Sequence, residues 1–417
     1  MILKLKKLIY RLLRSGEKYT HSDNIYIARQ GSYLGLSSFV FSLTALISAL
    51  VFARYLPKET YGQYKYILSV IAIFYTASLG GLDAALLRAV AKGFDRTVHL
   101  VFRTKLKWNL LASLGALLVG FYFLSQDNQL FFWAFLTAAF LIPLQESPKI
   151  YQAYLDGKKK FNKRALYTSL TRIIQASFLI AVVVLTKNLL LLIVVYFITD
   201  TLLANFFFIR TLHQYPPKSK QDKKSISYGK HLTLMNIIKG LSDGLDEILI
   251  FAFLGPVQVA IYAFAVLPIA HLRKPLKILV EIAAPKLVQR KEEDLKKQLP
   301  AKIIKALFLI VIPLIIFYIL IAPWAFRLLF PQYLESIPFS QLAALHLLSF
   351  PAVMLVQALR AHKKTKGLYR IYIFGPLLRI ALLCLMVPFY GVAGAILSRF
   401  FTILFSIALS FYYFKKT

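Results

Sequence analysis

The sequence predicts an all-α polytopic membrane protein in which twelve transmembrane helices form two six-helix lobes around a V-shaped central cavity. Three observations support this fold class. Hydrophobic residues make up 58% of the 417 positions, and the mean hydropathy is +0.63, whereas soluble domains are about 45–50% apolar. The apolar residues form long runs, and the basic residues gather in alternate connections between these runs.

The charge balance is strongly basic, with 51 Lys and Arg against 18 Asp and Glu and a formal net charge of +33. Such a balance is typical of a nucleic-acid-binding protein or of a multi-pass membrane protein with basic cytoplasmic loops. Because the hydropathy favours the membrane protein and its loops account for the charge, we expect no nucleic-acid partner.

The N-terminal segment, 1–24, combines apolar residues at helical spacing with many Lys and Arg residues. This pattern predicts a basic amphipathic helix that lies in the cytoplasmic headgroup layer and contacts anionic lipids. A disordered basic tail is the alternative.

Twelve segments have roughly the 20 apolar residues that a helix needs to cross the hydrocarbon core. Backbone polar groups in lipid must be satisfied within the segment, so we expect helices rather than isolated strands. The expected spans are 33–53, 64–86, 106–125, 130–155, 165–186, 189–210, 232–254, 257–284, 302–322, 338–359, 369–389 and 392–413.

The connections between these spans differ in charge from one side to the other. One set is rich in Lys and Arg, as in "KIYQAYLDGKKKFNKR" and "RKEEDLKKQLPAK", whereas the other set is short and poor in them, as in "SQDNQ" and "LGPVQ". Basic loops face the cytoplasm. We therefore expect the basic connections and both termini to be cytoplasmic.

An internal repeat divides the chain into two halves. Parallel repeats predict two lobes related by a pseudo-two-fold axis along the membrane normal, with substrate handled between them. We expect the lobes at 25–213 and 225–417, joined by a cytoplasmic linker at 214–224. A shift of 198 positions places Tyr64 on Tyr262, Asp83 on Glu281 and Arg88 on Lys286, and a slightly longer shift places Arg172 on Arg379.

The expected seventh span is the most polar of the twelve. Lys239, Asp243 and Glu247 follow one another at four-residue spacing, and Asp246 lies on the same helical face. Lys239 can neutralise only one acid, so a proton, a cation or basic residues of the other lobe must compensate the rest. Charges in a membrane usually face a cavity or a partner. Structural ion pairs between helices are the alternative to a functional face.

An acid and a base near the end of the expected second span raise a separate question. Five residues of helix separate Asp83 from Arg88, so their side chains point about 140° apart and cannot pair within the helix. Arg88 alone fits a snorkelling anchor. We expect Asp83 to meet a base from a neighbouring helix, and Glu281 and Lys286 to repeat this arrangement, as a gate at the cytoplasmic end.

Two arginines lie deep in their expected spans. Arg172 and Arg379 are about 12–15 Å from the helix ends at 1.5 Å per residue, which is deep for snorkelling. We expect them to face the lumen, with a structural ion pair as the alternative.

The motifs of soluble enzymes are missing from the sequence. There is no GxxxxGK[ST] phosphate loop, the seven histidines are scattered, and the single cysteine, Cys384, lies in an apolar run. We expect neither catalysis nor a metal or organic cofactor, other than a coupling Na⁺ or H⁺.

Two segments resemble a known family. "ARYLPKETYGQYKYILSVIAIFYTASLGGLDAALLRAVAKG" and "GLDEILIFAFLGPVQVAIYAFA" are similar to the matching hairpins that open the two lobes of Wzx-like polysaccharide repeat-unit flippases. These belong to the multidrug/oligosaccharidyl-lipid/polysaccharide exporter superfamily. The resemblance covers nearly the whole chain in length, span number and lobe order. The chain departs from it in the basic N-terminal extension, in Gly255–Pro256 and in the additional acid Glu247.

The resemblance implies a function in the bacterial cytoplasmic membrane. Such proteins carry undecaprenyl-diphosphate-linked oligosaccharides to the outer leaflet by rocking two lobes, and polysaccharide polymerase or assembly proteins are possible partners. The diphosphate would bind basic lumen residues, and a proton or sodium gradient would act on the acids of the seventh span. The expected diphosphate or sugar ligands are Arg172, Arg379, Arg29, Arg54 and Lys239, and the expected coupling acids are Asp243, Asp246 and Glu247.

Three other functions stay open on the sequence. A cation-coupled drug exporter of the same superfamily fits the acids of the seventh span but not the two deep arginines. A lipid II flippase shares the diphosphate chemistry and differs in the sugar. A membrane-embedded glycosyl- or phosphotransferase would need clustered acids around a metal, and the densest acidic stretch, "RKEEDLKK", is better explained as a solvated helix face.

Overall fold

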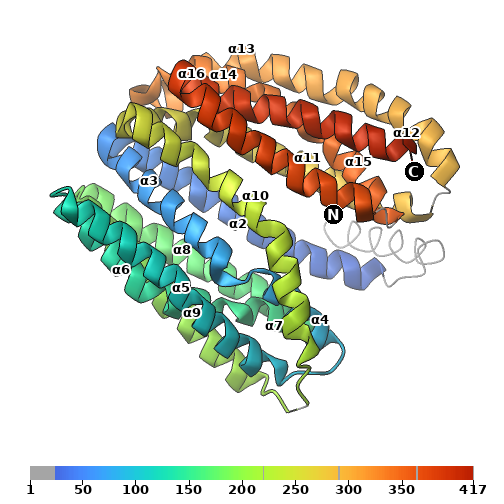
Figure 1. The fold of residues 1–417 in the computed structure, drawn as a ribbon, viewed down its shortest axis with the longest axis horizontal. Helices are drawn as coiled ribbons and strands as arrows, with labels where there is room; N and C mark the ends of the chain where they lie inside the picture. Colours follow the sequence, from blue (N-terminus) through green and yellow to red (C-terminus); the bar gives the residue numbers. More distant parts are fainter. Residues whose placement is uncertain (1–23, 219, 290–291, 363–364, 417) are drawn as a thin grey trace, which may run out of the picture.

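The computed structural model describes residues 24–218, 220–289, 292–362 and 365–416, and this part of the chain is helical with no strand. The sequence prediction of an all-helical, two-lobe membrane protein is confirmed. Figure 1 shows two groups of long helices that lie close together at one end and spread apart toward the other. The predicted N-terminal helix, 1–24, lies almost entirely outside the described residues.

The first lobe contains six long helical segments and several short ones. The short helices break two of the expected spans where the chain reaches the basic connections. The elements are α2 (Asn24–Tyr55), α3 (Lys58–Tyr75), η1 (Thr76–Ser78), α4 (Gly81–Ala91), α5 (Thr97–Ser125), α6 (Gln129–Glu146), η2 (Pro148–Ile150), α7 (Tyr151–Gly157), α8 (Phe161–Leu185) and α9 (Leu189–Gln214).

The second lobe also consists of long helices and short helical segments. Its elements are α10 (Lys224–Leu254), α11 (Pro256–Gln289), α12 (Glu292–Ala306), the π-helix η3 (Leu307–Val311), α13 (Ile312–Leu329), η4 (Pro331–Tyr333), α14 (Ser336–Ala343), η5 (Ala344–Ser349), α15 (Phe350–Ala361) and α16 (Thr365–Lys416).

Nine helical segments in the described part of the chain are long and apolar enough to cross a membrane, against the twelve spans expected from sequence. Two expected spans merge in α16, where Gly391 has a φ of 56° that interrupts an otherwise continuous helix. The second expected span is divided among α3, η1 and α4; α3 has 18 residues but carries Lys58, Glu59 and Lys65, and α4 has only 11 residues. The seventh, within α10, carries too many charges to qualify by hydropathy.

Local signals explain several helix starts. Asn128 accepts a hydrogen bond from the Phe131 amide at 3.1 Å, and Asn188 accepts one from the Leu191 amide at 3.0 Å, so both cap the helices that follow. In the linker, Asp222 accepts hydrogen bonds from Ser225 Oγ and the Lys224 amide just before α10. The hydrogen bond from Ser225 holds the pKa of Asp222 below its usual value.

The two lobes touch along α3 and α4 of the first lobe and α10 and α11 of the second. Small residues permit the close approach, because a Cβ at Gly81 would lie 2.3 Å from the Gly229 carbonyl oxygen. The Gly81 amide also donates to Thr233 Oγ1 at 3.0 Å. The backbones of the two lobes therefore lie in close contact where α4 crosses α10.

The end of the molecule opposite the basic connections is closed by contacts between the lobes. Lys58 Nζ lies 3.0 Å from Glu335 Oε1, and Gln332 Nε2 donates to the Arg54 carbonyl at 3.0 Å. Beneath them, the rings of Tyr61 and Phe264 pack with centroids 4.8 Å apart. We call this set of contacts, from Arg54 to Glu335, the closed end.

Candidate functional site

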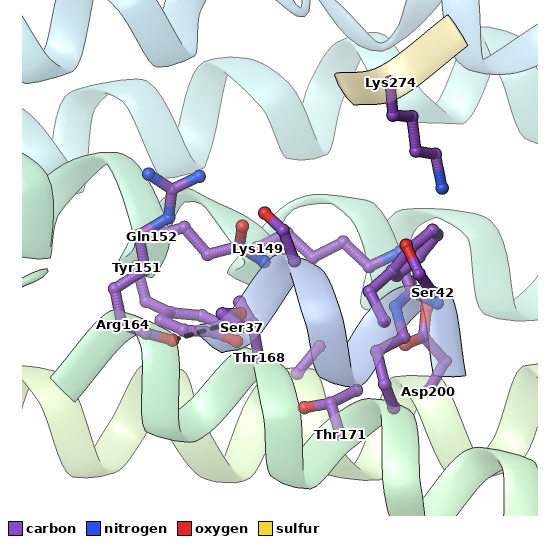
Figure 2. A pocket seen from close by; sticks show the side chains of 14 residues that line it. Ser37, Ser42, Lys149, Tyr151, Gln152, Arg164, Thr168, Thr171, Asp200 and Lys274 are labelled. Atoms are coloured by element: carbon purple, nitrogen blue, oxygen red, sulfur yellow. Dashed lines mark hydrogen bonds and ion pairs between the residues drawn. The ribbon is translucent and has the colours of Figure 1, made fainter. Parts of the chain in front are cut away.

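A polar cavity of about 520 Å³ lies between the lobes, and nearly all of its walls belong to the first lobe. Figure 2 shows Lys274 reaching from a separate segment toward the other lining side chains. The lining residues are Ser37, Ser38, Phe41 and Ser42 of α2, Lys149 of η2, Tyr151 and Gln152 of α7, Arg164, Thr168, Thr171 and Arg172 of α8, Asp200 and Ala204 of α9, and Lys274 of α11. We call it the central cavity.

Four cations but only one acid line the central cavity. Lys149 and Arg164 are already paired with carboxylates, at 2.7 Å from Asp200 and 2.6 Å from Asp156 respectively. Arg172 has no carboxylate within 4 Å in the described part of the chain, and neither does Lys274.

One aromatic ring holds the two cations that lack a carboxylate. The Arg172 guanidinium lies 5.1 Å from the centroid of the Phe41 ring, and Lys274 Nζ lies 4.8 Å from the same centroid. A cation over an aromatic face is stabilised without being neutralised. Arg172 and Lys274 therefore keep their full charge for an anion that enters the cavity, and they come from different lobes.

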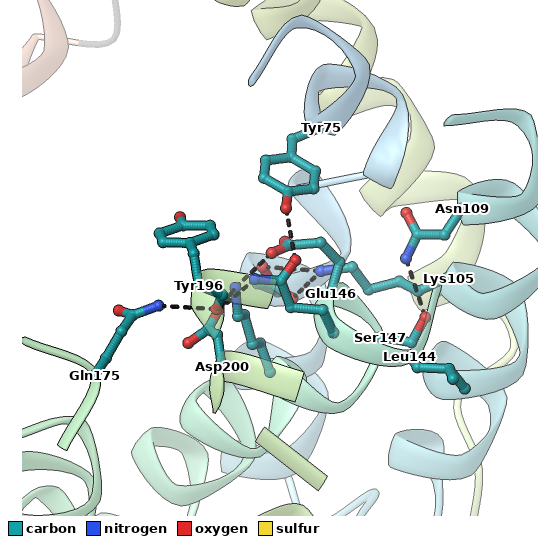
Figure 3. Close-up of polar contacts among 12 residues, drawn as sticks. Tyr75, Lys105, Asn109, Leu144, Glu146, Ser147, Gln175, Tyr196 and Asp200 are labelled. Carbon is teal, nitrogen blue, oxygen red and sulfur yellow. Dashed lines mark hydrogen bonds and ion pairs between the residues drawn. The ribbon is translucent and has the colours of Figure 1, made fainter. Parts of the chain in front are cut away.

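A hydrogen-bonded network fixes the floor of the central cavity (Figure 3). Lys149 lies between two carboxylates, 2.5 Å from Glu146 and 2.7 Å from Asp200. Gln145 donates to Asp200 at 2.6 Å and accepts from Tyr75 OH at 2.6 Å. Buried polar networks of this kind are stable when each group has a partner. The network positions Lys149 as part of the scaffold rather than as a free ligand.

Asp83, predicted to need a base from a neighbouring helix, has one. Lys105 of α5 lies 3.0 Å from Asp83 and is almost fully buried. Arg88 is exposed and stacks on Tyr228 of α10 at 5.3 Å, an anchor that crosses to the other lobe. The side chains of Glu281 and Lys286 lie outside the described residues, so the repeated half of the predicted gate stays a prediction.

A smaller cavity of about 340 Å³ connects the Asp83–Lys105 pair with the central cavity. Lys149, Gln152 and Arg164 line both. The polar space between the lobes therefore continues toward the end of the molecule that carries the basic connections.

Arg379 does not occupy the position in the second lobe that Arg172 occupies in the first. Its guanidinium contacts Asp243 at 2.7 Å and Asp246 at 2.5 Å, and its side chain is only 6% exposed. It is absent from the lining of the central cavity. The expected substrate-binding role of Arg379 is therefore not supported. The repeat conserves its charge, but two carboxylates of α10, which have no counterpart in the first lobe, engage it.

The acids of α10 are compensated within their own lobe. Besides Arg379, Asp243 contacts Lys239 at 2.5 Å and Arg399 at 3.6 Å, and Asp246 accepts a hydrogen bond from Tyr262. Asp243 and Asp246 therefore need neither a mobile cation nor a basic residue of the other lobe to neutralise them, contrary to the expectation from sequence.

Glu247 differs from the other two acids of α10. No basic group lies within 4 Å of it in the described part of the chain. Lys65 of α3, in the other lobe, and Arg399 of α16 act on its charge without an ion-pair contact. Of the three acids predicted to couple transport to an ion gradient, Glu247 is thus the one that has no ion pair in the described part of the chain.

The remaining predicted ligands do not reach the central cavity. Lys239 is exposed and tied to Asp243. Arg54 is exposed at the closed end, where its carbonyl accepts from Gln332. The side chain of Arg29 lies outside the described residues.

Sequence reasoning missed several functional candidates. Lys274 fell inside an expected span but was not singled out, although an uncompensated lysine there is itself a signal. Lys149 and Arg164 were assigned to a basic cytoplasmic loop, and Lys105 to the edge of a span. Only the fold brings these residues to the cavity and its extension.

An apolar groove of about 440 Å³ adjoins the central cavity, and Ser42 lines both. The groove lies between α2, α11 and α13. Its walls are almost wholly hydrocarbon and aromatic, with Leu43, Leu46, Leu272 and Phe317 among them. A ligand with a charged head and an apolar tail could therefore place the two parts in adjoining spaces.

No group of three or more His, Cys, Asp or Glu side chains within the described ranges could hold a metal ion. The central cavity instead offers hydroxyls, amides and two unpaired cations, which suit an anionic or hydroxyl-rich ligand.

Two helical lobes joined along α3, α4, α10 and α11, with a polar cavity between them, form the fold seen in solved structures of the multidrug/oligosaccharidyl-lipid/polysaccharide exporter (MOP) superfamily. The chain belongs to the family described as "Polysaccharide biosynthesis protein", whose sequence profile matches residues 51–338. The search of curated proteins gave no significant match.

Solved structures of this fold superimpose on most of the chain. A lipid II flippase MurJ in an inward closed conformation matches with a TM-score of 0.70 and 14% identity, over 92% of this chain and 87% of that one. An inward-facing multidrug resistance MATE family transporter of the MOP superfamily gives 0.64 and 12%, over 90% and 96%. A MOP superfamily transporter from Pyrococcus furiosus, described as having a binding pocket of reversed polarity, gives 0.59 and 13%, over 94% and 96%.

Proposed function

We propose that this protein is a flippase that moves undecaprenyl-diphosphate-linked oligosaccharide repeat units from the inner to the outer leaflet of the bacterial cytoplasmic membrane. The observation that carries the proposal is the central cavity, in which Arg172 and Lys274 lack carboxylate partners. A diphosphate is the part of such a lipid that hydrocarbon excludes most strongly. Charge-assisted contacts with two cations would compensate its desolvation.

The position of the two cations supports alternating access. Arg172 is on α8 of the first lobe and Lys274 on α11 of the second, so a diphosphate bound by both would bridge the lobes. The closed end seals the cavity from the side opposite the basic connections. With those connections in the cytoplasm, the cavity would take its ligand from the inner leaflet.

The apolar groove offers a place for the prenyl chain. It adjoins the central cavity at Ser42. Burial of hydrocarbon against apolar side chains contributes about 0.8 kcal/mol per methylene relative to water, but little relative to lipid. We infer that the groove orients the chain rather than supplying most of the affinity.

The drive for transport would be an ion gradient. We infer that Glu247, rather than Asp243 or Asp246, is the acid that responds to it, because the other two are held by Arg379. Ionised Glu247 attracts Lys65 across the lobe contact. Protonation or cation binding would remove that attraction and favour separation of the lobes.

A multidrug exporter of the same superfamily is the main competing function. An exporter of organic cations needs an acidic or neutral lumen, whereas the central cavity has four cations against one acid. A lipid II flippase is the second competing function, because its substrate has the same diphosphate chemistry and differs in the glycan; a lipid II flippase MurJ is among the structures with this fold.

The test is deletion of the gene followed by extraction of lipid-linked intermediates. We expect repeat units to accumulate on the inner leaflet and surface polysaccharide to be lost. Complementation with Arg172→Gln should restore less than about a tenth of the polymer, and Arg172→Lys should restore more. Arg210→Gln, an exposed arginine of α9 outside the cavity, is the matched control. Full restoration by Arg172→Gln would contradict the proposal.

A further inference from the structure

A second cavity, of about 310 Å³, lies within the second lobe between α11, η5, α15 and α16. Three of its lining side chains are cations, namely Arg273, Lys274 and Arg399, and none of its described lining residues is an acid. Ser349 and Phe350 add a hydroxyl and an aromatic ring to the wall. We call this space the arginine pocket.

The positive charge of the arginine pocket is only partly compensated, because Arg399 lies 3.6 Å from Asp243 whereas Arg273 has no carboxylate partner in the described part of the chain. The Arg273 side chain is half-buried. Asp243 is the acid whose charge acts on Arg273 from a distance. That acid already contacts Lys239 at 2.5 Å, Arg379 at 2.7 Å and Arg399 at 3.6 Å, so one carboxylate faces three cations before Arg273 is counted.

Neighbouring cations add to the positive charge around Arg273. Arg399 and Arg379 both act on Arg273 electrostatically, and their charges oppose its own. Like charges held together in a partly buried site disfavour the folded protein unless something compensates them. An anionic ligand between Arg273 and Arg399 would supply that compensation.

The arginine pocket adjoins the central cavity, because Lys274 lines both. A ligand with one anion in the central cavity and a second anion further along its length could therefore occupy both spaces. At 100° per residue, Arg273 lies about 120° around α11 from Leu267, which lines the apolar groove. The prenyl chain and the group in the arginine pocket would thus lie on different faces of this helix.

We propose that the arginine pocket binds the carboxylate of an acidic sugar in the transported oligosaccharide, so that the repeat unit is of the uronic-acid-containing class. This rests on the proposed function. The planar guanidinium forks of Arg273 and Arg399 suit the two oxygens of a carboxylate. Ser349 can hydrogen-bond a sugar hydroxyl, and the Phe350 ring can pack against the apolar face of a pyranose.

Binding to the purified full-length protein in nanodiscs tests the proposal with three probes. These are farnesyl diphosphate, a farnesyl-diphosphate-linked disaccharide that ends in glucuronic acid, and the same compound ending in glucose. We expect the wild-type protein to bind the glucuronic acid probe about tenfold more tightly than the glucose probe, the lower range for a charge-assisted hydrogen bond. Arg273→Gln should remove this preference, and Arg273→Lys should retain part of it.

The outcomes separate this proposal from the one on which it rests. Equal affinity of the wild-type protein for the two disaccharide probes overturns the acidic-sugar assignment, whatever the variants do. A uniform loss for all three probes in Arg273→Gln overturns it too, because the pocket would then bind the diphosphate itself. Arg172→Gln should weaken all three probes equally. Unchanged binding in Arg172→Gln would contradict the diphosphate site of the proposed function and leave the sugar preference standing.

Discussion

Arg379 occupies a different position from the one that the repeat suggests. Its counterpart, Arg172, faces the central cavity, whereas Arg379 is buried between Asp243 and Asp246. Buried pairs of this kind add little net stability when complete, because desolvation offsets the attraction. They become costly when one partner is removed, because the remaining charges stay buried.

We therefore predict that Arg379→Gln is strongly destabilising. It leaves two carboxylates on one helix face, and the loss should be about 3 kcal/mol or more, the usual cost of breaking a buried ion pair. Thermal unfolding of the purified protein should show a lower melting temperature, which Arg379→Gln combined with Asp246→Asn should partly restore. Arg54→Gln, at an exposed site, is the control. A melting temperature equal to wild type for Arg379→Gln would show that these pairs are not structural.

Glu247 should behave differently from its neighbours on α10. With no ion pair in the described part of the chain, Glu247→Gln should leave the melting temperature nearly unchanged. It should, however, abolish the dependence of transport on an imposed ion gradient in proteoliposomes, since the proposed coupling acid is removed. Asp246→Asn should instead lower stability, because Arg379 loses a partner. Gradient-dependent transport by Glu247→Gln would exclude this residue as the coupling group.

At the scale of elements, close backbone approach controls how the lobes meet. Gly62 at the start of α3 faces Pro256 at the start of α11, and a Cβ there would lie 1.8 Å from the Pro256 carbonyl oxygen. Backbone cannot move aside as a flexible side chain can. The contact at the closed end therefore depends on the absence of a side chain at position 62.

We predict that Gly62→Ala shifts the protein toward a form in which the closed end is open. The added methyl group is incompatible with the α3–α11 contact, so the lobes must separate there. Spin labels on α3 and α14 should report a longer distance in the variant by electron paramagnetic resonance. Gly35→Ala in α2, where nothing lies within 4 Å of the added carbon, is the matched control. An unchanged distance distribution would mean that the helices adjust locally instead.

The sequence predicts the helices far better than the contacts between them. Hydropathy and loop charge identify the apolar segments because each depends on neighbouring residues alone. The division of 64–86 into α3, η1 and α4 was missed, since it depends on packing against α10. The sequence predicts that Asp83 pairs with a base from a neighbouring helix, but it does not identify Lys105. That residue is 22 positions away, and only the fold brings it near.

The residues of the candidate site were predicted less completely than the helices. Arg172 could be identified because a deep arginine in an apolar run is costly. Lys274 became a candidate only when the fold placed it beside Phe41, a residue of the other lobe. Whether a charge is free or neutralised depends on every helix around it, and the opposite outcomes at Arg172 and Arg379 follow from that.

At the scale of the whole molecule, the proposed alternating access would require the closed end to open during each transport cycle. Lys58 and Glu335 come from different lobes and lie 3.0 Å apart. The salt bridge itself contributes little, because exposed pairs are worth about 1 kcal/mol or less. The pair is nevertheless useful for an experiment, because it marks one position on each lobe. These two positions must separate if the lobes rock, and they can stay together if the ligand passes in another way.

We therefore predict that a covalent link between these positions stops transport reversibly. The native Cys384 is first replaced by serine, and Lys58→Cys with Glu335→Cys is then treated with a short bis-methanethiosulfonate linker. Flipping of a lipid-linked oligosaccharide in proteoliposomes should fall to background and return when the link is reduced. Lys58→Cys with Glu59→Cys, a pair within α3, is the control that should keep its activity after the same treatment. Because the link leaves the central cavity untouched, ligand binding should persist. Full transport by the linked protein would contradict a mechanism in which the lobes separate at this end.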